Sequence, residues 1–328
     1  LSKKNDVLIP SSGETALDIS SLSCIKEDDV LLGGDLNVMR PHKDYDGEFF
    51  AYYLSNFQDK NIAKLAQGHS VVHLYASHLK TLKIILPTLP EQKKIAGFLE
   101  STDQWIKNLQ NQKEFFESYK KGMMQKIFSQ EIRFKDDNEN NFPKWEEKKL
   151  VEVFNITAGQ TKSKHITSTG ENIIVDMGGI SSDGRLIANK YTSYSKDFLT
   201  TNDLVMPKDD IGGGFIIGRV ARIYINNKYI CGDHIFKLTK LQGDIGYLFY
   251  AVNSFKVSRS LRKKANGTAQ LGLGRGSVDN QITPFPALPE QQKIAEFLTS
   301  VDNLIESKQQ QIDLAENWKK GLMQRMFV

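Results

Sequence analysis

The sequence of 328 residues contains only two cysteines, Cys24 and Cys231, and no long run of apolar residues. Two cysteines cannot build a disulfide framework or a four-ligand zinc cluster, which is typical of proteins of the reducing cytoplasm. No apolar stretch approaches the roughly 18 residues that a membrane-spanning helix needs. The first residues, Leu1 to Asp6, lack the apolar core of a secretory signal. We therefore expect a cytoplasmic protein that has no membrane partner.

Motifs for catalysis are also absent. The sequence has no GxxxxGK[ST] phosphate loop, and no Asn-Pro-Pro-Phe-like segment of the kind that methyltransferases use to hold an extruded adenine. Residues 272–276 lack the spacing of a dinucleotide-binding loop. His69, His73 and His78 could in principle ligate a metal, but they lack cysteine or carboxylate companions at ligand spacing, which favours surface or DNA-facing histidines. We expect no catalytic residue, metal ion or cofactor on this chain.

An internal repeat organises the chain. Residues 87–99 recur as residues 286–298 at an offset of 199, without a gap. About 22 of the 42 positions are identical when residues 87–128 are aligned with 286–327. The repeat continues more faintly upstream, where Asn5–Pro10 resembles Asn202–Pro207. Each unit is therefore a variable block followed by a constant block.

The first variable block is the shorter of the two. In the second unit more than 50 residues lie between Pro143 and Asn202, whereas only four residues precede Asn5 in the first. We expect the chain to open partway into its first unit, as an N-terminally truncated protein would.

The constant blocks predict two long helices. Pro90 and Pro289 suit the first helical position, and Glu91 and Glu290 suit the positive end of the helix dipole. No later proline interrupts either block, and some 38 helical residues would make a rod of roughly 57 Å. Apolar residues recur close to a heptad period, which predicts that the two helices pair, and an antiparallel pairing would place the variable blocks at opposite ends of the rod.

The residues expected in the helix–helix seam follow this heptad period in each copy. They are Ile95, Phe98, Leu99, Ile106, Leu109, Phe116 and Met123 in the first copy, and Ile294, Phe297, Leu298, Val301, Ile305, Ile312 and Leu322 in the second.

The variable blocks have the composition of mixed domains rich in strands. Residues 172–175, 215–225 and 234–238 have strand composition, and glycine-rich or polar segments such as 212–214 separate them as turns. Residues 246–252 predict a helix that carries on toward Lys264.

Basic and polar loops in these blocks favour nucleic acid as a ligand. The net charge of +4 permits DNA binding without demanding it, because local clustering of cations matters more than the sum. Any one such loop is more often a solvated surface, but loops at matched places in both units indicate a duplicated binding surface. The DNA-binding candidates in the second unit are Lys162, Lys164, His165, Lys208, Arg259, Arg262, Lys263, Lys264, Thr268, Gln270 and Arg275. Those in the first unit are Ser11, Ser12, Lys64, Gln67, His69 and Ser70.

A variable block followed by Leu-Pro-Glu-Gln-x-Lys-Ile-Ala-x-Phe-Leu and a long helix, occurring twice, resembles the specificity subunit of type I restriction-modification enzymes. The resemblance is strongest at 87–128 and 286–327, and Asn141–Leu150 is similar to the usual entry to a target recognition domain. It implies an α+β fold with two α/β target recognition domains, separated by two long helices that pair as an antiparallel coiled coil in a pseudo-twofold repeat. The implied division is recognition domain 1 at 1–86, a central helix at 87–130, recognition domain 2 at 131–285 and a distal helix at 286–328.

The resemblance also implies the function. Each recognition domain would read one half of a bipartite, asymmetric site in double-stranded DNA, and the helices would set the unread spacer. The subunit would have no activity itself. It would recruit two modification subunits that bind S-adenosylmethionine and methylate adenine N6, and restriction subunits that use ATP and Mg²⁺ to translocate and cleave DNA, in the bacterial or archaeal cytoplasm at the nucleoid.

Two interpretations from other classes stay open at this point. A coiled-coil scaffold that binds only proteins would show no DNA sequence preference, and it would leave the matched polar loops unexplained. An enzyme with an unrecognised site would show activity as an isolated chain.

Overall fold

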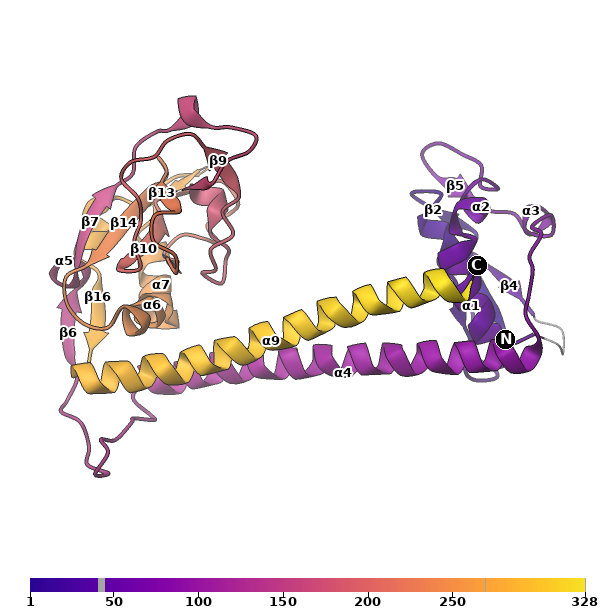
Figure 1. The fold of residues 1–328 in the computed structure, drawn as a ribbon, viewed down its shortest axis with the longest axis horizontal. Coiled ribbons are helices and arrows are strands. Elements are labelled where there is room, and N and C mark those ends of the chain that lie inside the picture. Colours follow the sequence, from indigo (N-terminus) through magenta and orange to yellow (C-terminus); the bar gives the residue numbers. More distant parts are fainter. Residues whose placement is uncertain (41–44, 269, 328) are drawn as a thin grey trace. The chain divides into compact units, whose positions relative to one another are not determined.

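The structure is a computed structural model that describes residues 1–40, 45–268 and 270–327. The chain divides into two compact units: unit 1 comprises Leu1–Lys113 with Ser307–Val328, and unit 2 comprises Glu114–Glu306. Two long helices, α4 (Leu89–Phe128) and α9 (Leu288–Met326), each contribute one part to each unit. Figure 1 shows both helices as uninterrupted ribbons.

A three-stranded antiparallel sheet lies at the centre of the globular part of unit 1. Its middle strand β1 (Val7–Pro10) pairs with β3 (Ser23–Cys24) and with β4 (Leu36–Met39). Val7 and Ile9 point to the same face of the sheet and are fully buried, as expected for a strand that covers a core on one side. Helix α1 (Gly47–Phe57) packs on β1 and β3. The remaining elements are β2 (Ser12–Gly13), a 3-10 turn η1 (Asp18–Ser20), α2 (Asp59–Ala63), β5 (Val72–His73) and α3 (Ala76–Leu79).

Unit 2 contains two larger sheets. In the first, β12 (Ala221–Arg222), β10 (Asp203–Pro207), β14 (Ile235–Lys240) and β7 (Phe154–Ala158) are antiparallel neighbours in that order. In the second, β8 (Asn172–Val175) lies between a parallel neighbour, β13 (Tyr229–Cys231), and an antiparallel one, β9 (Lys190–Thr192). The strands predicted at 172–175 and 234–238 are therefore confirmed.

Two short strand pairs and several short helices complete unit 2. The pairs are β6 (Glu146–Lys149) with β16 (Ile282–Phe285), and β11 (Asp209–Asp210) with β15 (Leu271–Gly272). The helices are α5 (Leu150–Val153), η2 (Ser163–His165), η3 (Met177–Gly179), α6 (Ile245–Asn253), α7 (Phe255–Lys263) and α8 (Arg275–Asp279).

The faint upstream repeat corresponds to real structural equivalence. Asn5–Pro10 and Asn202–Pro207 contain β1 and β10, each of which lies inside its sheet and pairs with an equivalent strand, β4 or β14. Later elements also correspond, since β2, the pair α1 and α2, β5 and α3 in unit 1 match β11, the pair α6 and α7, β15 and α8 in unit 2, where β16 is added before α9.

Two predictions about local structure are wrong. The helix expected from Gly246 to Lys264 is two helices, because Ser254 adopts φ −59° and ψ 150°, which ends α6 before α7 begins. The strand expected over 215–225 is reduced to β12. Gly213, Gly214 and Gly218 adopt φ values of +85°, +80° and +75°, so the chain turns where the apolar composition favours a strand.

Within each unit the parts of α4 and α9 are antiparallel. In unit 1, Asp103 lies beside Lys319, and Ile106 and Leu109 form a buried cluster with Ile312 and Ala315. In unit 2, Lys120 pairs with Asp302, while Ile127 shares a core with Ile294 and Leu298. Residue numbers thus rise along α4 as they fall along α9. The predicted α+β class, with a repeated unit and two long antiparallel helices, is confirmed.

Half of the predicted seam residues are buried, and all but one of the others are half-buried. Leu99, Ile106, Leu109, Ile294, Leu298, Val301 and Ile312 are buried, and Ile95, Phe116, Met123, Phe297, Ile305 and Leu322 are half-buried. Phe98 is 39% exposed and lies edge-on to Trp318, with ring centroids 5.7 Å apart. The boundaries proposed for the recognition domains stay predictions, and the helices themselves begin at Leu89 and Leu288, one residue before the proline in each copy.

Glu290 does more than face the helix dipole. Its side chain is fully buried and accepts from the Arg133 guanidinium at 3.1 and 2.7 Å and from Trp145 Nε1 at 2.9 Å. It therefore joins the start of α9 to the segment between α4 and β6. Glu91, the equivalent residue in α4, is exposed.

Candidate nucleic-acid interface

The two units present the same exposed hairpin. In unit 1, Gln67 and His73 exchange backbone hydrogen bonds of 2.9 and 2.7 Å, and in unit 2 Asn266 and Gly272 do so with the same lengths. Gly68 and Gly267 open the turns with φ values of +125° and +121°. A Cβ at either glycine would lie about 2 Å from a backbone oxygen three residues later, which explains why glycine occupies both positions.

Each hairpin is held beside the short strand that follows the central strand of its sheet. β5 pairs with β2 in unit 1, and β15 pairs with β11 in unit 2. The structure therefore brings together loops that are remote in sequence and leaves their side chains accessible. The predicted residues on these turns, Gln67, His69, Ser70, Thr268 and Gln270, are exposed or half-buried, whereas Ala269 lies outside the described residues.

Helix α7 lies next to the hairpin of unit 2 and lines an open pocket of about 410 Å³. Three arginines, Arg219, Arg259 and Arg262, contribute to its wall together with Lys263. Among the residues that the structure describes, no carboxylate lies within ion-pair distance of any of these four cations. A pocket with four cations and no internal counter-ion is suited to an anionic ligand such as a phosphate.

Two exposed phenylalanines hold the arginines of this pocket. The Arg262 guanidinium lies 5.3 Å from the ring centroid of Phe215, and Arg259 lies 5.4 Å from that of Phe255. Arg262 also donates to the Gly213 carbonyl oxygen at 3.1 Å. These interactions restrain long side chains that would otherwise lose entropy on binding.

The third arginine of the pocket is partly desolvated. Arg219 donates to the Asn253 carbonyl oxygen at 3.0 Å, and burial lowers the pKa of its guanidinium from the ordinary value. An anion bound here would compensate for that desolvation. Sequence reasoning missed Arg219, Phe215 and Phe255. The signal for Arg219 is one charged residue in an otherwise apolar run, from Phe215 to Ala221.

The glycine-rich loop beside the pocket is organised by a buried carboxylate. Asp210 accepts hydrogen bonds from the backbone N–H groups of Gly212 at 2.5 Å and Ile216 at 3.1 Å. These bonds hold the loop that carries Phe215, of which 63% is exposed.

Three further predicted cations of unit 2 already have partners. Lys264 Nζ donates to Gln281 Oε1 at 2.9 Å, and Arg275 Nε donates to Asp279 Oδ1 at 2.6 Å. Lys208 Nζ lies 3.7 Å from Asp233 Oδ1. These interactions stabilise the loops, and a role of the three cations toward DNA stays a prediction.

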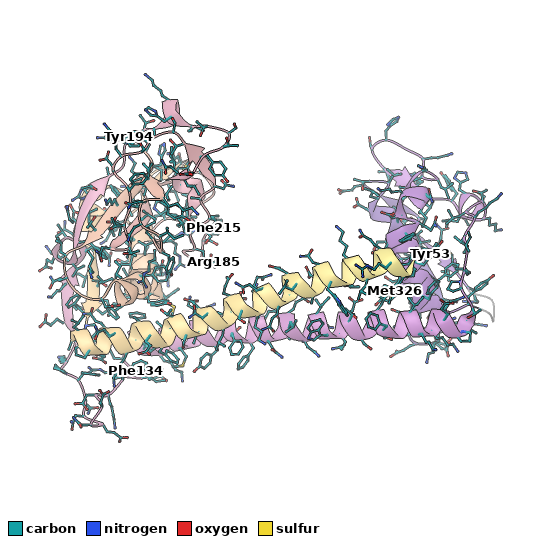
Figure 2. The ribbon with its side chains drawn as sticks, in the orientation of Figure 1. Tyr53, Phe134, Arg185, Tyr194, Phe215 and Met326 are labelled. Atoms are coloured by element: carbon teal, nitrogen blue, oxygen red, sulfur yellow. The ribbon has the colours of Figure 1, made fainter. Side chains whose placement is uncertain are left out.

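A second basic cluster surrounds Tyr194. Lys162 Nζ lies 4.8 Å from the centre of the Tyr194 ring, and the His165 ring is 5.4 Å from it. Lys164 is exposed and adjacent in sequence to His165. Figure 2 places Tyr194 and Phe215 on different parts of unit 2, so the two clusters are separate surfaces.

In unit 1 the predicted serines Ser11 and Ser12 form hydrogen bonds to a carboxylate. Ser11 Oγ donates to Asp35 Oδ1 at 2.7 Å, and Ser12 Oγ donates to Asp35 Oδ2. These two bonds lower the pKa of Asp35. The serines therefore fix the segment that carries β2, while Lys64 lies at the C-terminal end of α2.

Neither cysteine is suited to thiolate chemistry, since burial raises the pKa of both Cys24 and Cys231 to about 12. Across residues 1–40, 45–268 and 270–327, no group of three or more histidine, cysteine, aspartate or glutamate side chains is arranged to hold a metal ion. No helix in the described part of the chain is both long enough and apolar enough to cross a membrane.

Known proteins share this arrangement. A family model described as the type I restriction modification DNA specificity domain matches residues 1–115 and 143–317. Among curated relatives from Methanocaldococcus jannaschii, the type I restriction enzyme MjaVIII specificity subunit is 28% identical over 340 residues, covering 98% of this chain and 77% of the relative. The putative MjaX specificity subunit is 28% identical over 316 residues, covering 91% and 71%.

Solved structures show the same fold. The S subunit of the type I system from M. genitalium matches with a TM-score of 0.66 and 17% identity, over all of this chain and 84% of that one. A chain from a structure of type I restriction-modification complex assembly matches with a TM-score of 0.54 and 13% identity, over 99% and 82%. Because the family model covers most of the sequence, the chain belongs to the type I restriction-modification DNA specificity subunits.

Proposed function

We propose that each globular domain of this chain reads one half of a split, asymmetric site in double-stranded DNA. The observation that carries the proposal is the duplicated hairpin, Gln67–His73 in unit 1 and Asn266–Gly272 in unit 2, exposed beside equivalent strands. Two copies of one surface suit a site that is read in two parts. Their turns differ in sequence, with His69 where the second copy has Thr268, and this suits half-sites of different sequence.

At each half-site, one set of side chains would bind phosphates and another would discriminate bases. The cations of the α7 pocket, with Lys162 and Lys164, would bind phosphates and set the register of the domain on the duplex. Exposed polar side chains on the hairpin would discriminate bases, because an amide such as that of Gln270 can bond to adenine N6 and N7 in the major groove.

The chemistry would belong to partner subunits. We infer that this chain is non-catalytic and holds two modification subunits, which bind S-adenosylmethionine and methylate adenine N6. An adenine must leave the base stack to be methylated, so the catalytic partner has to be held at a fixed register on the DNA. Restriction subunits that use ATP and Mg²⁺ would join the same complex, in the cytoplasm.

Exposed aromatic side chains on the long helices suit such partners. In unit 1, Trp105 and Trp318 are each 48% exposed and lie edge-on, with centroids 6.4 Å apart. In unit 2, Phe115 is 64% exposed and stacks on Tyr119 at 6.4 Å. Aromatic pairs left in solvent on a helix are typical anchors for a protein partner, and we assign them to helices of the modification subunits.

A selection experiment tests the proposal. The full chain, assembled with its modification subunits, would be used to capture duplexes from a randomised DNA library. We expect two short blocks of selected bases separated by a constant number of unselected positions. Trp105→Ala with Trp318→Ala should release the modification subunits, while Gln125→Ala, an exposed change on α4, should not. A complex that assembles but enriches no sequence would support the scaffold interpretation instead.

A further inference from the structure

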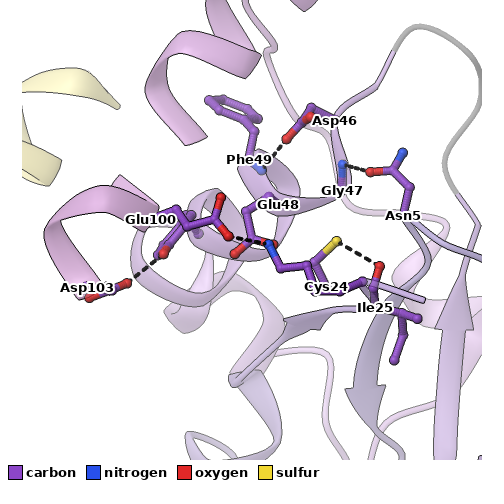
Figure 3. Close-up of polar contacts among 11 residues, drawn as sticks. Asn5, Cys24, Ile25, Asp46, Gly47, Glu48, Phe49, Glu100 and Asp103 are labelled. Carbon is purple, nitrogen blue, oxygen red and sulfur yellow. Dashed lines mark hydrogen bonds and ion pairs between the residues drawn. The ribbon is translucent and has the colours of Figure 1, made fainter. Parts of the chain in front are cut away.

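A tyrosine, an aspartate and a lysine meet in unit 1 where the globular domain joins the helices. Tyr52 on α1 donates its hydroxyl proton to Asp103 Oδ2 on α4 at 2.6 Å. Lys319 on α9 reaches the other oxygen of the same carboxylate at 2.5 Å, and its Nζ lies 5.1 Å from the centre of the Tyr52 ring. Figure 3 shows Asp103 with the dashed hydrogen bond that it accepts.

The same three residue types meet in unit 2. Tyr250 on α6 donates to Asp302 Oδ2 on α9 at 2.6 Å. Lys120 on α4 reaches Asp302 Oδ1 at 2.6 Å, and its Nζ lies 5.4 Å from the centre of the Tyr250 ring. The helices have exchanged roles, since the aspartate now comes from α9 and the lysine from α4.

Each of these clusters, which we call clamps, joins three elements through one carboxylate. The tyrosine comes from the domain, the aspartate from the long helix that follows it in sequence, and the lysine from the antiparallel helix. Both carboxylate oxygens are therefore used, one by the domain and one by the second helix. Such a clamp can close only when the domain is seated and the two helices are paired in register.

The tyrosines are chemically suited to remain donors. Burial is the main cause that raises the pKa of both Tyr52 and Tyr250 above the ordinary phenol value, and the neighbouring aspartate raises each further. Each hydroxyl therefore stays protonated over the whole physiological range, and the bond to the carboxylate is charge-assisted.

A second attachment holds α1 and α6, the helices that carry the clamp tyrosines, at their first turns. Gln92 Oε1 accepts from the backbone N–H of Asp46 at 2.9 Å, and Gln291 Oε1 accepts from that of Asp244 at 2.8 Å. Both glutamines are buried and also donate to a proline carbonyl oxygen five residues earlier. Asp46 and Asp244 are the N-caps of α1 and α6. The glutamine thus fixes each helix at its first turn, and the hydroxyl of Tyr52 or Tyr250 fixes it again further along.

An ordinary surface ion pair would not be expected to recur in this way. Between residues 102 and 119, most positions differ from their counterparts at an offset of 199, yet Asp103 is matched by Asp302 and Lys120 by Lys319. The lysine and aspartate side chains are only 18–41% exposed, which reduces the screening that weakens exposed pairs.

We propose that the two Tyr–Asp–Lys clamps are positioning devices that fix the angle of each recognition domain on its helix pair and so set the spacer length that the subunit accepts. This inference rests on the proposed function, because it assigns the clamp to the alignment of a DNA-reading surface. Opening a clamp should let the domain lean about its glutamine attachment. The bases that the domain reads would stay the same, while their distance from the other half-site would be less restricted.

The test uses the full chain assembled with its modification subunits and a set of duplexes that carry both half-sites with the native spacer or with one base pair more or fewer. Asp302→Asn and Lys120→Met should raise methylation at the altered spacers, relative to the native one, by about tenfold, the factor expected when one charge-assisted hydrogen bond is removed. Asp103→Asn should act similarly in unit 1.

Controls separate this role from simple stability. Tyr250→Phe keeps the ring and its packing but removes the hydroxyl, so it should relax the spacer even if the charge variants fold poorly. Lys126→Met removes an exposed ion pair with Glu131 and should leave the spacer preference unchanged.

The outcomes distinguish the two proposals. Folded variants that keep the wild-type spacer preference, or that lose methylation equally at every spacer, would overturn the positioning role while leaving DNA reading intact. A wild-type complex that methylates without any half-site preference would overturn the proposed function itself.

Discussion

A single buried carboxylate organises three segments of unit 2 at the start of α9. Glu290 accepts both the Arg133 guanidinium and the Trp145 indole N–H, and it is fully buried, whereas the equivalent Glu91 of α4 is exposed. We therefore expect the same motif position to contribute differently to the free energy of unfolding in the two copies. The difference follows from what surrounds each glutamate and not from the motif.

We expect Glu290→Gln to lower the free energy of unfolding of unit 2 by about 2–4 kcal/mol, because Arg133 would lose the charge that compensates its desolvation. Glu91→Gln, the matched control, should cost less than about 0.5 kcal/mol. Urea denaturation followed by tryptophan fluorescence checks this, since Trp145 is itself a partner. Equal effects of the two changes would contradict the account.

An acid-sensitive ion pair in unit 1 gives a prediction about pH. Asp6 is buried and accepts two bonds of 2.8 Å from Arg40, which lower the pKa of its carboxyl below the ordinary value. A folded-state pKa below the unfolded one contributes stability above the unfolded value of about 3.9, and this contribution is lost as pH falls through the folded pKa. Asp6→Asn should therefore destabilise unit 1 at pH 7, and the difference from wild type should shrink below about pH 4. A difference that persists at low pH would show that the ion pair is not its source.

Gln270 carries the prediction about base reading. Gln270→Ala should relax sequence choice at one or two positions of one half-site, by roughly 1–3 kcal/mol per position. Gln125→Ala, on an exposed face of α4, should leave choice unchanged. Selection from a DNA library randomised at that half-site checks the outcome, and uniform weakening on all sequences would refute a base-reading role.

At the scale of elements, α7 concentrates the cations that lack an internal counter-ion. Arg259→Gln, Arg262→Gln and Lys263→Gln should each reduce the slope of log K against log salt by about 0.9, the value for one phosphate that is no longer neutralised. Binding would weaken on specific and non-specific DNA alike. Lys256→Gln, on the same helix but outside the pocket and 3.9 Å from Glu147, is the control. An unchanged slope in the arginine variants would exclude this pocket from the interface.

The long helices were the most predictable elements, because the same heptad pattern occurs twice in the sequence and no proline interrupts it after the first turn. The break at Ser254 and the turns at Gly213, Gly214 and Gly218 were not predictable, since the surrounding residues have helix or strand composition and only the local backbone angles decide. The matched hairpins could be anticipated as polar loops. Their pairing with β2 and β11 could not, because it depends on hydrogen bonds between segments remote in sequence.

The candidate site, too, could be predicted from the sequence only in part. Cations on α7 and beside the hairpin were named from their clustering, but three of the predicted cations turn out to contact a polar or acidic side chain, namely Lys264, Arg275 and Lys208. Arg219, remote in sequence from α7, was missed because only folding brings it into the pocket. The sequence also gave no sign that the tyrosine, aspartate and lysine of each clamp lie together, since each comes from a different element.

At the scale of the whole molecule, the central claim is that one chain carries two readers. The repeat of a strand, a short paired hairpin and a domain helix in both units supports that claim, and so does the reuse of the same tyrosine, aspartate and lysine where each domain meets the helices.

The most direct measurement maps methyladenine across a genome in cells that express the full chain with its modification subunits. The account predicts methylation within a split motif, two short sequences separated by a spacer of constant length. Methylation without sequence preference, or in one continuous motif, would contradict it.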